Sequence, residues 1–141
     1  MANRGFTLIE LVLSIGLFMI IISGISAYNS NWFLSNNLGS SKNIVVSSLR
    51  KAQNYSLSKK NNLTWGVCLT GSTVRLFGGT CASPTIKDDY VLPANVSITG
   101  LSTVTFSSLR GEPSAPQAIS ISSNNKTFLI NINSVGGLSI N

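Results

Sequence analysis

The chain has 141 residues, a formal net charge of +6 and a charged fraction of only 10%. Its length fits one domain. Histidine is absent, which excludes imidazole acid–base catalysis and histidine metal sites. The mean hydropathy of +0.30 is high for a soluble protein, and a single apolar segment near the N-terminus accounts for much of it.

This apolar segment runs from Phe6 to about Tyr28 and carries one formal charge, on Glu10. No proline interrupts it, so a helix over residues 6–27 would be about 33 Å long, enough to cross a hydrocarbon core of about 30 Å. We therefore predict a membrane-spanning helix over residues 6–28. A carboxylate is costly in such a helix, so we expect Glu10 to have a function and a partner.

Two simpler interpretations compete with this one. A secretory signal peptide has an apolar core of about 7–15 residues and a small-residue cleavage site. Here the core is longer, contains an acid, and is followed by Ile25-Ser26-Ala27, which fits such a site poorly. A plain membrane anchor fits the length but leaves Glu10 without a function.

The sequence Gly5-Phe6-Thr7-Leu8-Ile9-Glu10-Leu11 resembles the processing motif of type IV prepilins and of the pseudopilins of type II secretion. The resemblance implies that prepilin peptidase cuts between Gly5 and Phe6 and that the new amine of Phe6 is methylated. Residues 1–5 would then be a leader peptide, and Arg4 fits the excess of positive charge on the cytoplasmic side.

The same resemblance implies where the protein lies and what it meets. It would be a single-pass inner-membrane protein with a cytoplasmic N-terminus and an external head, and after assembly it would belong to a pilus or pseudopilus. The implied partners are the prepilin peptidase/N-methyltransferase, other pilin or pseudopilin subunits, and the inner-membrane assembly platform.

Phe6 and Glu10 are the expected assembly residues. After cleavage, the Phe6 amine and the Glu10 carboxylate are opposite charges in a low-dielectric place, and pairing offsets much of their desolvation cost. The resemblance implies that the pair forms between subunits, with Glu10 of the incoming subunit meeting Phe6 of one already in the filament. A pair within one helix stays open, because the two residues are four apart.

Beyond Tyr28 the pattern predicts that the helix continues as an amphipathic helix over residues 29–60. Apolar residues recur at spacings of three, four or seven, which is typical of a helix with one buried face. They are Leu34, Leu38, Val45, Leu49 and Ala52. Gly24 and Gly39 are the points at which we expect any loosening, and Lys59-Lys60-Asn61-Asn62 suits the helix end.

From residue 61 to residue 141 the period changes to two, which predicts a β-rich globular head. Gly71-Ser72 is a hairpin signal that sets Leu69 opposite Val74, and Asn124-Asn125 is a second hairpin signal. We expect a surface loop over residues 82–89. The predicted fold class is α+β: a long N-terminal helix, membrane-spanning in its first half and amphipathic in its second, packed on a small antiparallel sheet.

The two cysteines, Cys68 and Cys81, are expected to form a disulfide. Two thiols without histidine or nearby acids make a poor zinc site, and a head outside the membrane favours the oxidised state. Closing this loop of about 14 residues would contribute about 3 kcal/mol in the chain-entropy model. Two unpaired core cysteines are the alternative.

A narrower resemblance concerns the head. Val104-Thr105-Phe106, then Gly111, two short strands and Val135-Gly136-Gly137-Leu138 are similar to the GspH/FimT group of minor pilins and pseudopilins. Some FimT-type members bind DNA through basic residues close to the C-terminus. Residues 136–141 of this chain contain no arginine or lysine.

The sequence thus predicts a structural filament subunit, a minor type IV pilin or a type II secretion pseudopilin, with no catalytic residue, cofactor or metal. A major pilin is one alternative. Another is a DNA-binding tip pilin of a competence or DNA-uptake pilus, supported by nine Lys/Arg beyond the membrane segment but weakened by their dispersal. Asp88-Asp89 lacks the loop motif of a calcium site.

Overall fold

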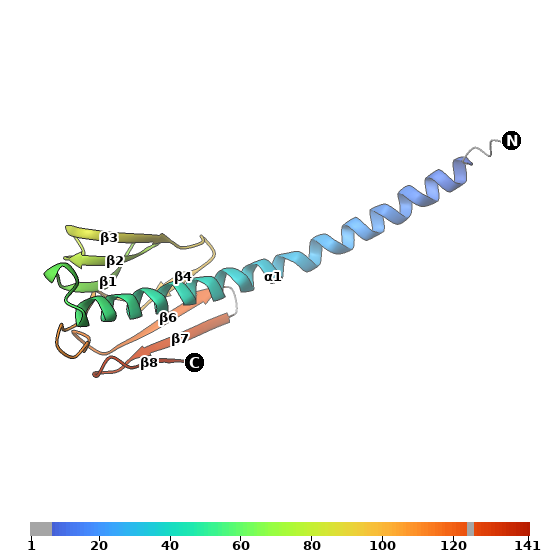
Figure 1. The fold of residues 1–141 in the computed structure, drawn as a ribbon. Coiled ribbons are helices and arrows are strands. Elements are labelled where there is room, and N and C mark those ends of the chain that lie inside the picture. Colours follow the sequence, from blue (N-terminus) through green and yellow to red (C-terminus); the bar gives the residue numbers. More distant parts are fainter. Residues whose placement is uncertain (1–6, 124–125) are drawn as a thin grey trace. The chain divides into compact units, whose positions relative to one another are not determined.

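The structure is a computed structural model that describes residues 7–123 and 126–141, without the side chains of residues 24–35. The chain forms two compact units, residues 1–33 and residues 34–141 (Figure 1). A single α-helix, α1, runs from Leu8 to Leu57. It continues through Gly24 and Gly39 without a break, so the loosening expected at these glycines is not seen.

Within the second unit, the predicted apolar stripe of α1 is buried from Leu38 onward, and the side chain of Leu34 lies outside the described residues. Leu38, Val45, Leu49 and Ala52 are at most 1% exposed. Three serines share this buried face, namely Ser41, Ser48 and Ser56. Because serine side chains are short, this face of the helix can lie close to the strands that cover it.

The head contains two antiparallel four-stranded sheets rather than the one sheet expected. The first has the order β3-β2-β1-β5, and the second has the order β4-β6-β7-β8. The strands of the first sheet are β1 (Trp65–Thr70), β2 (Thr73–Gly79), β3 (Pro84–Val91) and β5 (Val104–Thr105). Those of the second are β4 (Ser97–Thr99), β6 (Gln117–Ser123), β7 (Lys126–Ile132) and β8 (Leu138–Ile140).

One core joins the helix and the two sheets. Trp65 and Leu76 from the first sheet and Ile119 and Ile130 from the second belong to the same buried cluster as Leu49 of α1. Figure 1 shows the green part of α1 running along both sheets. The helix is therefore the element on which both halves of the head pack, which confirms the α+β fold class.

The predicted hairpin at Gly71-Ser72 is confirmed in its register. Leu69 pairs with Val74, and Val67 pairs with Leu76. In the second hairpin Ser123 pairs with Lys126, while the turn residues Asn124-Asn125 lie outside the described residues.

The expected surface loop over residues 82–89 is wrong for most of its length, because Pro84–Val91 is strand β3. The strand escapes detection because it lies at a sheet edge and is largely exposed, so no apolar alternation marks it. The strand pairs with β2, and an ion pair adds to that pairing. Arg75 of β2 stands directly opposite Asp89 and binds both carboxylate oxygens, at 2.6 Å from Nε and 3.0 Å from Nη2.

Cys68 and Cys81 form a disulfide, with their Cα atoms 6.3 Å apart. Cys68 is buried in β1, and Cys81 lies in the turn between β2 and β3. The bond thus ties the connection that leads into the edge strand back to the middle of the sheet. Arg75 Nη1 also donates a hydrogen bond to the Cys81 carbonyl at 3.4 Å.

Gln53 of α1 hydrogen-bonds two loops of the head and so attaches them to the helix. Its Nε2 donates to the carbonyl of Gly111 at 2.9 Å and to that of Gly136 at 3.2 Å. Both glycines have positive φ, of 65° and 82°. A Cβ on Gly136 would collide with the Gln53 amide and the Gly111 carbonyl, so these loops approach the helix closely only because glycine stands there.

A Gln53→Ala substitution should lower the free energy of unfolding by about 1–3 kcal/mol, because it leaves two buried carbonyls without a donor. The matched control is Asn54→Ala, a change at the exposed neighbouring position. Urea unfolding of the full chain in detergent micelles, followed by tryptophan fluorescence, measures both. Equal stability of Gln53→Ala and Asn54→Ala would contradict the clamping role.

The Arg75–Asp89 pair should make the head sensitive to acid. The hydrogen bond from Arg75, aided by Lys87 at 3.4 Å, holds the pKa of Asp89 below its usual value. A carboxyl group whose pKa is lowered by folding stabilises the protein above the unfolded pKa of about 4, and this stabilisation is lost as the pH falls through the folded pKa. The Asp89→Asn variant should therefore be less stable than the wild type at neutral pH, and its stability should fall less steeply below about pH 4.

Melting temperatures measured across this pH range test the effect, with Asp88→Asn on the same strand as the control. An Asp89→Asn profile parallel to that of the wild type would show that the ion pair does not contribute to folding stability.

Candidate functional site: the start of the long helix

The start of α1 contains one half of a capping box, in which the Glu10 side chain reaches back to Thr7. Glu10 Oε2 accepts hydrogen bonds from the Thr7 backbone N–H at 3.4 Å and from the Thr7 hydroxyl at 3.3 Å. Glu10 is the third residue of the helix that begins at Leu8, the position from which an acid reaches back to the residue before the helix. Its negative charge also suits the positive end of the helix dipole.

Sequence reasoning missed this local role of Glu10, although its signal was available. Threonine followed three residues later by glutamate, just before an apolar run, is the known pattern of a helix start. Thr7 therefore joins Glu10 as a residue of the site. In the described part of the chain, Glu10 has no cationic partner.

The two processing residues, Gly5 and Phe6, lie outside the described residues. Of the two predicted assembly residues, only Glu10 lies in the described part of the chain. It is in the first turn of the helix, shortly after the expected cleavage point.

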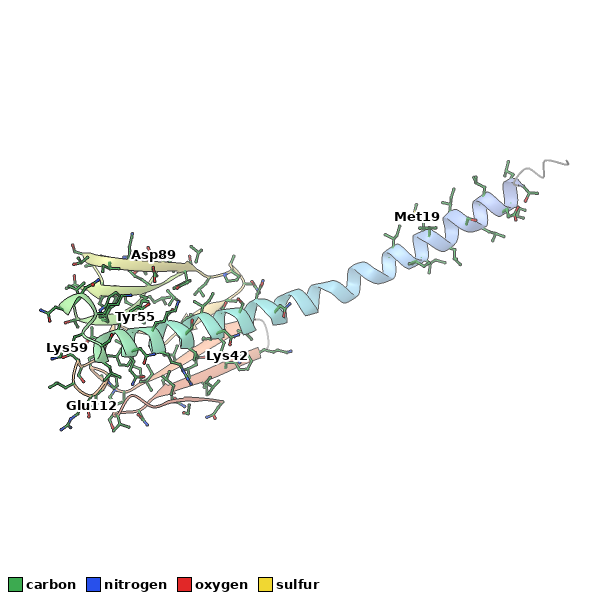
Figure 2. All side chains as sticks on the ribbon, in the orientation of Figure 1. Met19, Lys42, Tyr55, Lys59, Asp89 and Glu112 are labelled. Carbon is green, nitrogen blue, oxygen red and sulfur yellow. A yellow bond between two sulfur atoms is a disulfide. The ribbon has the colours of Figure 1, made fainter. Side chains whose placement is uncertain are left out.

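The helix that follows is covered by apolar side chains on all sides. Its twelve large apolar residues between Leu8 and Ile22 are 51–82% exposed. Figure 2 shows these side chains around the helix, with Met19 labelled. A contiguous apolar surface of this kind marks a contact with lipid or with other protein.

The polar groups in this stretch are satisfied within the helix. Ser14 Oγ donates to the Glu10 carbonyl at 2.7 Å, and Ser23 Oγ donates to the Ile20 carbonyl at 2.9 Å. Neither hydroxyl therefore needs water. At Gly16 no atom lies within 4 Å of where a Cβ would stand, so the backbone is open to close approach by another helix.

No helix in the described part of the chain is long and apolar enough to cross a membrane. The predicted span over residues 6–28 includes Phe6 and the side chains of residues 24–28, which lie outside the described residues.

The basic residues of the head are distributed over separate contacts. Arg75 and Lys87 pair with Asp89, and Arg110 lies 3.6 Å from Glu112. Lysines lie over aromatic rings in three further places: Lys42 over Phe128, Lys51 over Tyr90, and Lys60 over Tyr55. The Tyr90 hydroxyl, 3.3 Å from Lys51 Nζ, raises the pKa of Lys51. These contacts give no support to a basic stripe for nucleic acid.

The described residues also contain no group of three or more histidine, cysteine or acidic side chains that could hold a metal ion. The Asp89 carboxylate forms an ion pair with Arg75 on the neighbouring strand. The Asp88-Asp89 pair therefore lies on an edge strand rather than in a metal-binding loop.

Residues 1–26 match the family model of the prokaryotic N-terminal methylation motif. Searches of curated proteins and of solved structures gave no significant match. The matched segment contains the expected cleavage point, Thr7 and Glu10. This finding supports a type IV pilin-like prepilin or pseudopilin: a membrane-anchored precursor that is processed by prepilin peptidase and assembled with other pilin subunits. Families with this motif are generally structural rather than enzymatic.

Proposed function

We propose that this chain is a minor type IV pilin or type II secretion pseudopilin of the GspH/FimT-like group. The observation that carries the proposal is Glu10, an acid without a cationic partner in the described residues, at the start of a helix that is otherwise apolar to Ile22. Residues 1–5 would be the leader, residues 6–28 the membrane and filament-core helix, residues 29–60 its amphipathic continuation, and residues 61–141 the head.

Cleavage between Gly5 and Phe6 would place a new positive charge close to Glu10. Thr7 supplies neutral hydrogen-bond donors, so within the described residues no positive charge compensates the Glu10 carboxylate. In an apolar environment an uncompensated charge is strongly destabilising, and an amine on a neighbouring subunit offsets that cost. On assembly, the Glu10 carboxylate would thus form an ion pair with the Phe6 amine of another subunit.

Neighbouring helices would bury the apolar surface of residues 8–22 in the filament. The absence of a side chain at Gly16 and the short, internally bonded side chains of Ser14 and Ser23 permit close helix packing. The inner-membrane assembly platform would supply the site at which the subunit leaves the lipid. The head would then be displayed at the filament surface.

Substitutions at Glu10 separate its capping role from its charge. Glutamine can replace glutamate in a capping box, so Glu10→Gln keeps the hydrogen bond to Thr7 and removes the charge, whereas Glu10→Val removes both. We expect both variants to insert into the membrane and both to be absent from sheared filaments, with a loss of at least about tenfold, the equivalent of about 1.4 kcal/mol. Immunoblots of membrane and filament fractions measure this.

The control is Thr7→Val, which removes the hydroxyl bond and leaves the charge in place. Thr7→Val should enter filaments. Normal incorporation of Glu10→Gln would show that capping alone suffices and would refute the ion-pair role.

Processing is tested by the mass of the mature protein. The chain recovered from filaments should begin at a methylated Phe6, and Gly5→Leu should retain the leader, because glycine lets the extended backbone lie close to the groups of the peptidase. Asn3→Ala is the control and should be cleaved normally. A filament subunit that still carries residues 1–5 would contradict the proposal.

A further inference from the structure

A cleft of about 590 Å³ lies at the end of the head where α1 terminates. One wall is the turn that follows the helix, with Lys59 and Asn62, and the other is the segment after β5, with Ser108 and Glu112. Figure 2 shows Lys59 and Glu112 at this end of the head. The volume falls within the range of about 300–1,000 Å³ that is typical of small-molecule sites.

The cleft offers polar groups that the head itself does not use. The side chains of Asn62, Thr64, Thr105 and Ser108 line it and form no hydrogen bond within the described part of the chain. Together they present both donors and acceptors, since a hydroxyl and a side-chain amide each supply both. Such groups fix the orientation of a bound ligand.

Other hydroxyls of the cleft hold its walls in shape. Ser107 Oγ accepts the backbone N–H of Glu112 at 3.2 Å, and Ser114 Oγ accepts that of Thr105 at 3.3 Å. The buried Ser56 hydroxyl donates to the Trp65 carbonyl at 3.4 Å. The walls are therefore formed before any ligand enters.

The charges of the cleft favour a neutral ligand. Lys59 and Glu112 are its one cation and one anion among the described lining residues, so the lining has no net charge, and Arg110 outside the lining lies 3.6 Å from Glu112. A phosphate would meet Glu112 and the negative end of the α1 dipole. A divalent cation would meet Lys59 and find a single carboxylate.

Leu63 and Pro113 add two half-buried apolar side chains to the lining. A pyranose ring combines an apolar C–H face with an edge of hydroxyl groups. The apolar side chains of the cleft can pack against the C–H face of such a ring. Its unpaired hydroxyl and amide groups can hydrogen-bond the ring hydroxyls.

The backbone of the helix-terminal turn points to the same site. Lys59, Asn61 and Asn62 have φ of 49°, 55° and 54°, a left-handed conformation that asparagine adopts readily and lysine does not. Lysine stands at the position after the helix where glycine is usual. Strained non-glycine residues of this kind cluster at ligand sites.

We propose that this cleft binds a neutral saccharide of one or two rings. Asn62, Thr64, Thr105 and Ser108 hydrogen-bond its hydroxyl groups, and Leu63 and Pro113 pack against its C–H face. The site goes beyond the filament-subunit function and does not depend on it, because every lining residue belongs to the second compact unit, residues 34–141.

The test uses the full-length protein in phosphocholine micelles, so that no sugar-based detergent competes. Saturation-transfer NMR and calorimetric titration with cellobiose and N,N′-diacetylchitobiose measure binding. The variants Thr105→Val and Ser108→Ala each remove one hydroxyl and should weaken binding by about threefold to tenfold. Thr85→Val, which removes an exposed hydroxyl on β3 outside the cleft, should bind as the wild type does, and melting temperatures verify that each variant is folded.

Binding of either disaccharide that weakens in both cleft variants and not in Thr85→Val supports the proposal. Saccharide binding unchanged in the cleft variants overturns it, as does the absence of binding by both disaccharides. Binding of inorganic phosphate or of a single-stranded oligonucleotide that is lost in Thr105→Val would assign the cleft to an anion and overturn it too. The titration uses unassembled protein, so failure here is distinguishable from failure of Glu10-dependent assembly.

Discussion

The uncovered apolar surface at the start of α1 is the constraint on which the rest of the molecule depends. Twelve large side chains between Leu8 and Ile22 are more than half exposed. In the proposed function, lipid would cover this surface before assembly and neighbouring helices would cover it afterwards. Its few polar groups are consistent with this, because Ser14 and Ser23 donate to carbonyls of their own helix and need no water.

Glu10 combines a local and an intermolecular role in one carboxylate. Locally it is the third residue of the helix and accepts the N–H of Thr7. A capping bond satisfies a backbone donor but does not neutralise a charge, and this difference gives the proposed subunit contact its driving force. The same geometry explains why the acid is tolerated before assembly, since it lies at the exposed first turn rather than in the middle of the helix.

In the head, α1 is the shared scaffold of two sheets. The first sheet packs Trp65 and Leu76 and the second packs Ile119 and Ile130 into one core with the helix. Gln53 then fastens the loops at Gly111 and Gly136 to the last turns of α1. The segment that contains Gly111 also forms one wall of the polar cleft at the helix end, through Ser108 and Glu112.

The sequence by itself determined the features that depend on neighbouring residues. Helical spacing predicted the buried face of α1, and the two-residue turn at Gly71-Ser72 fixed the register of β1 and β2. The match over residues 1–26 reflects a local motif as well. The contact between Glu10 and Thr7 at the start of α1 is equally local, and the spacing of Thr7 and Glu10 in the sequence indicates it.

Only the tertiary structure decided the features that rest on long-range contacts. Strand β3 has no apolar alternation, and it is placed by its pairing with β2, in which Asp89 meets Arg75, 14 residues earlier. The division into two sheets follows from which strands pair with each other. Gln53 is bonded to Gly111 and Gly136, which lie 58 and 83 positions later in the chain. The cleft arises in the same way, because its walls come from the helix-terminal turn and the segment after β5, which meet only once both pack on the core.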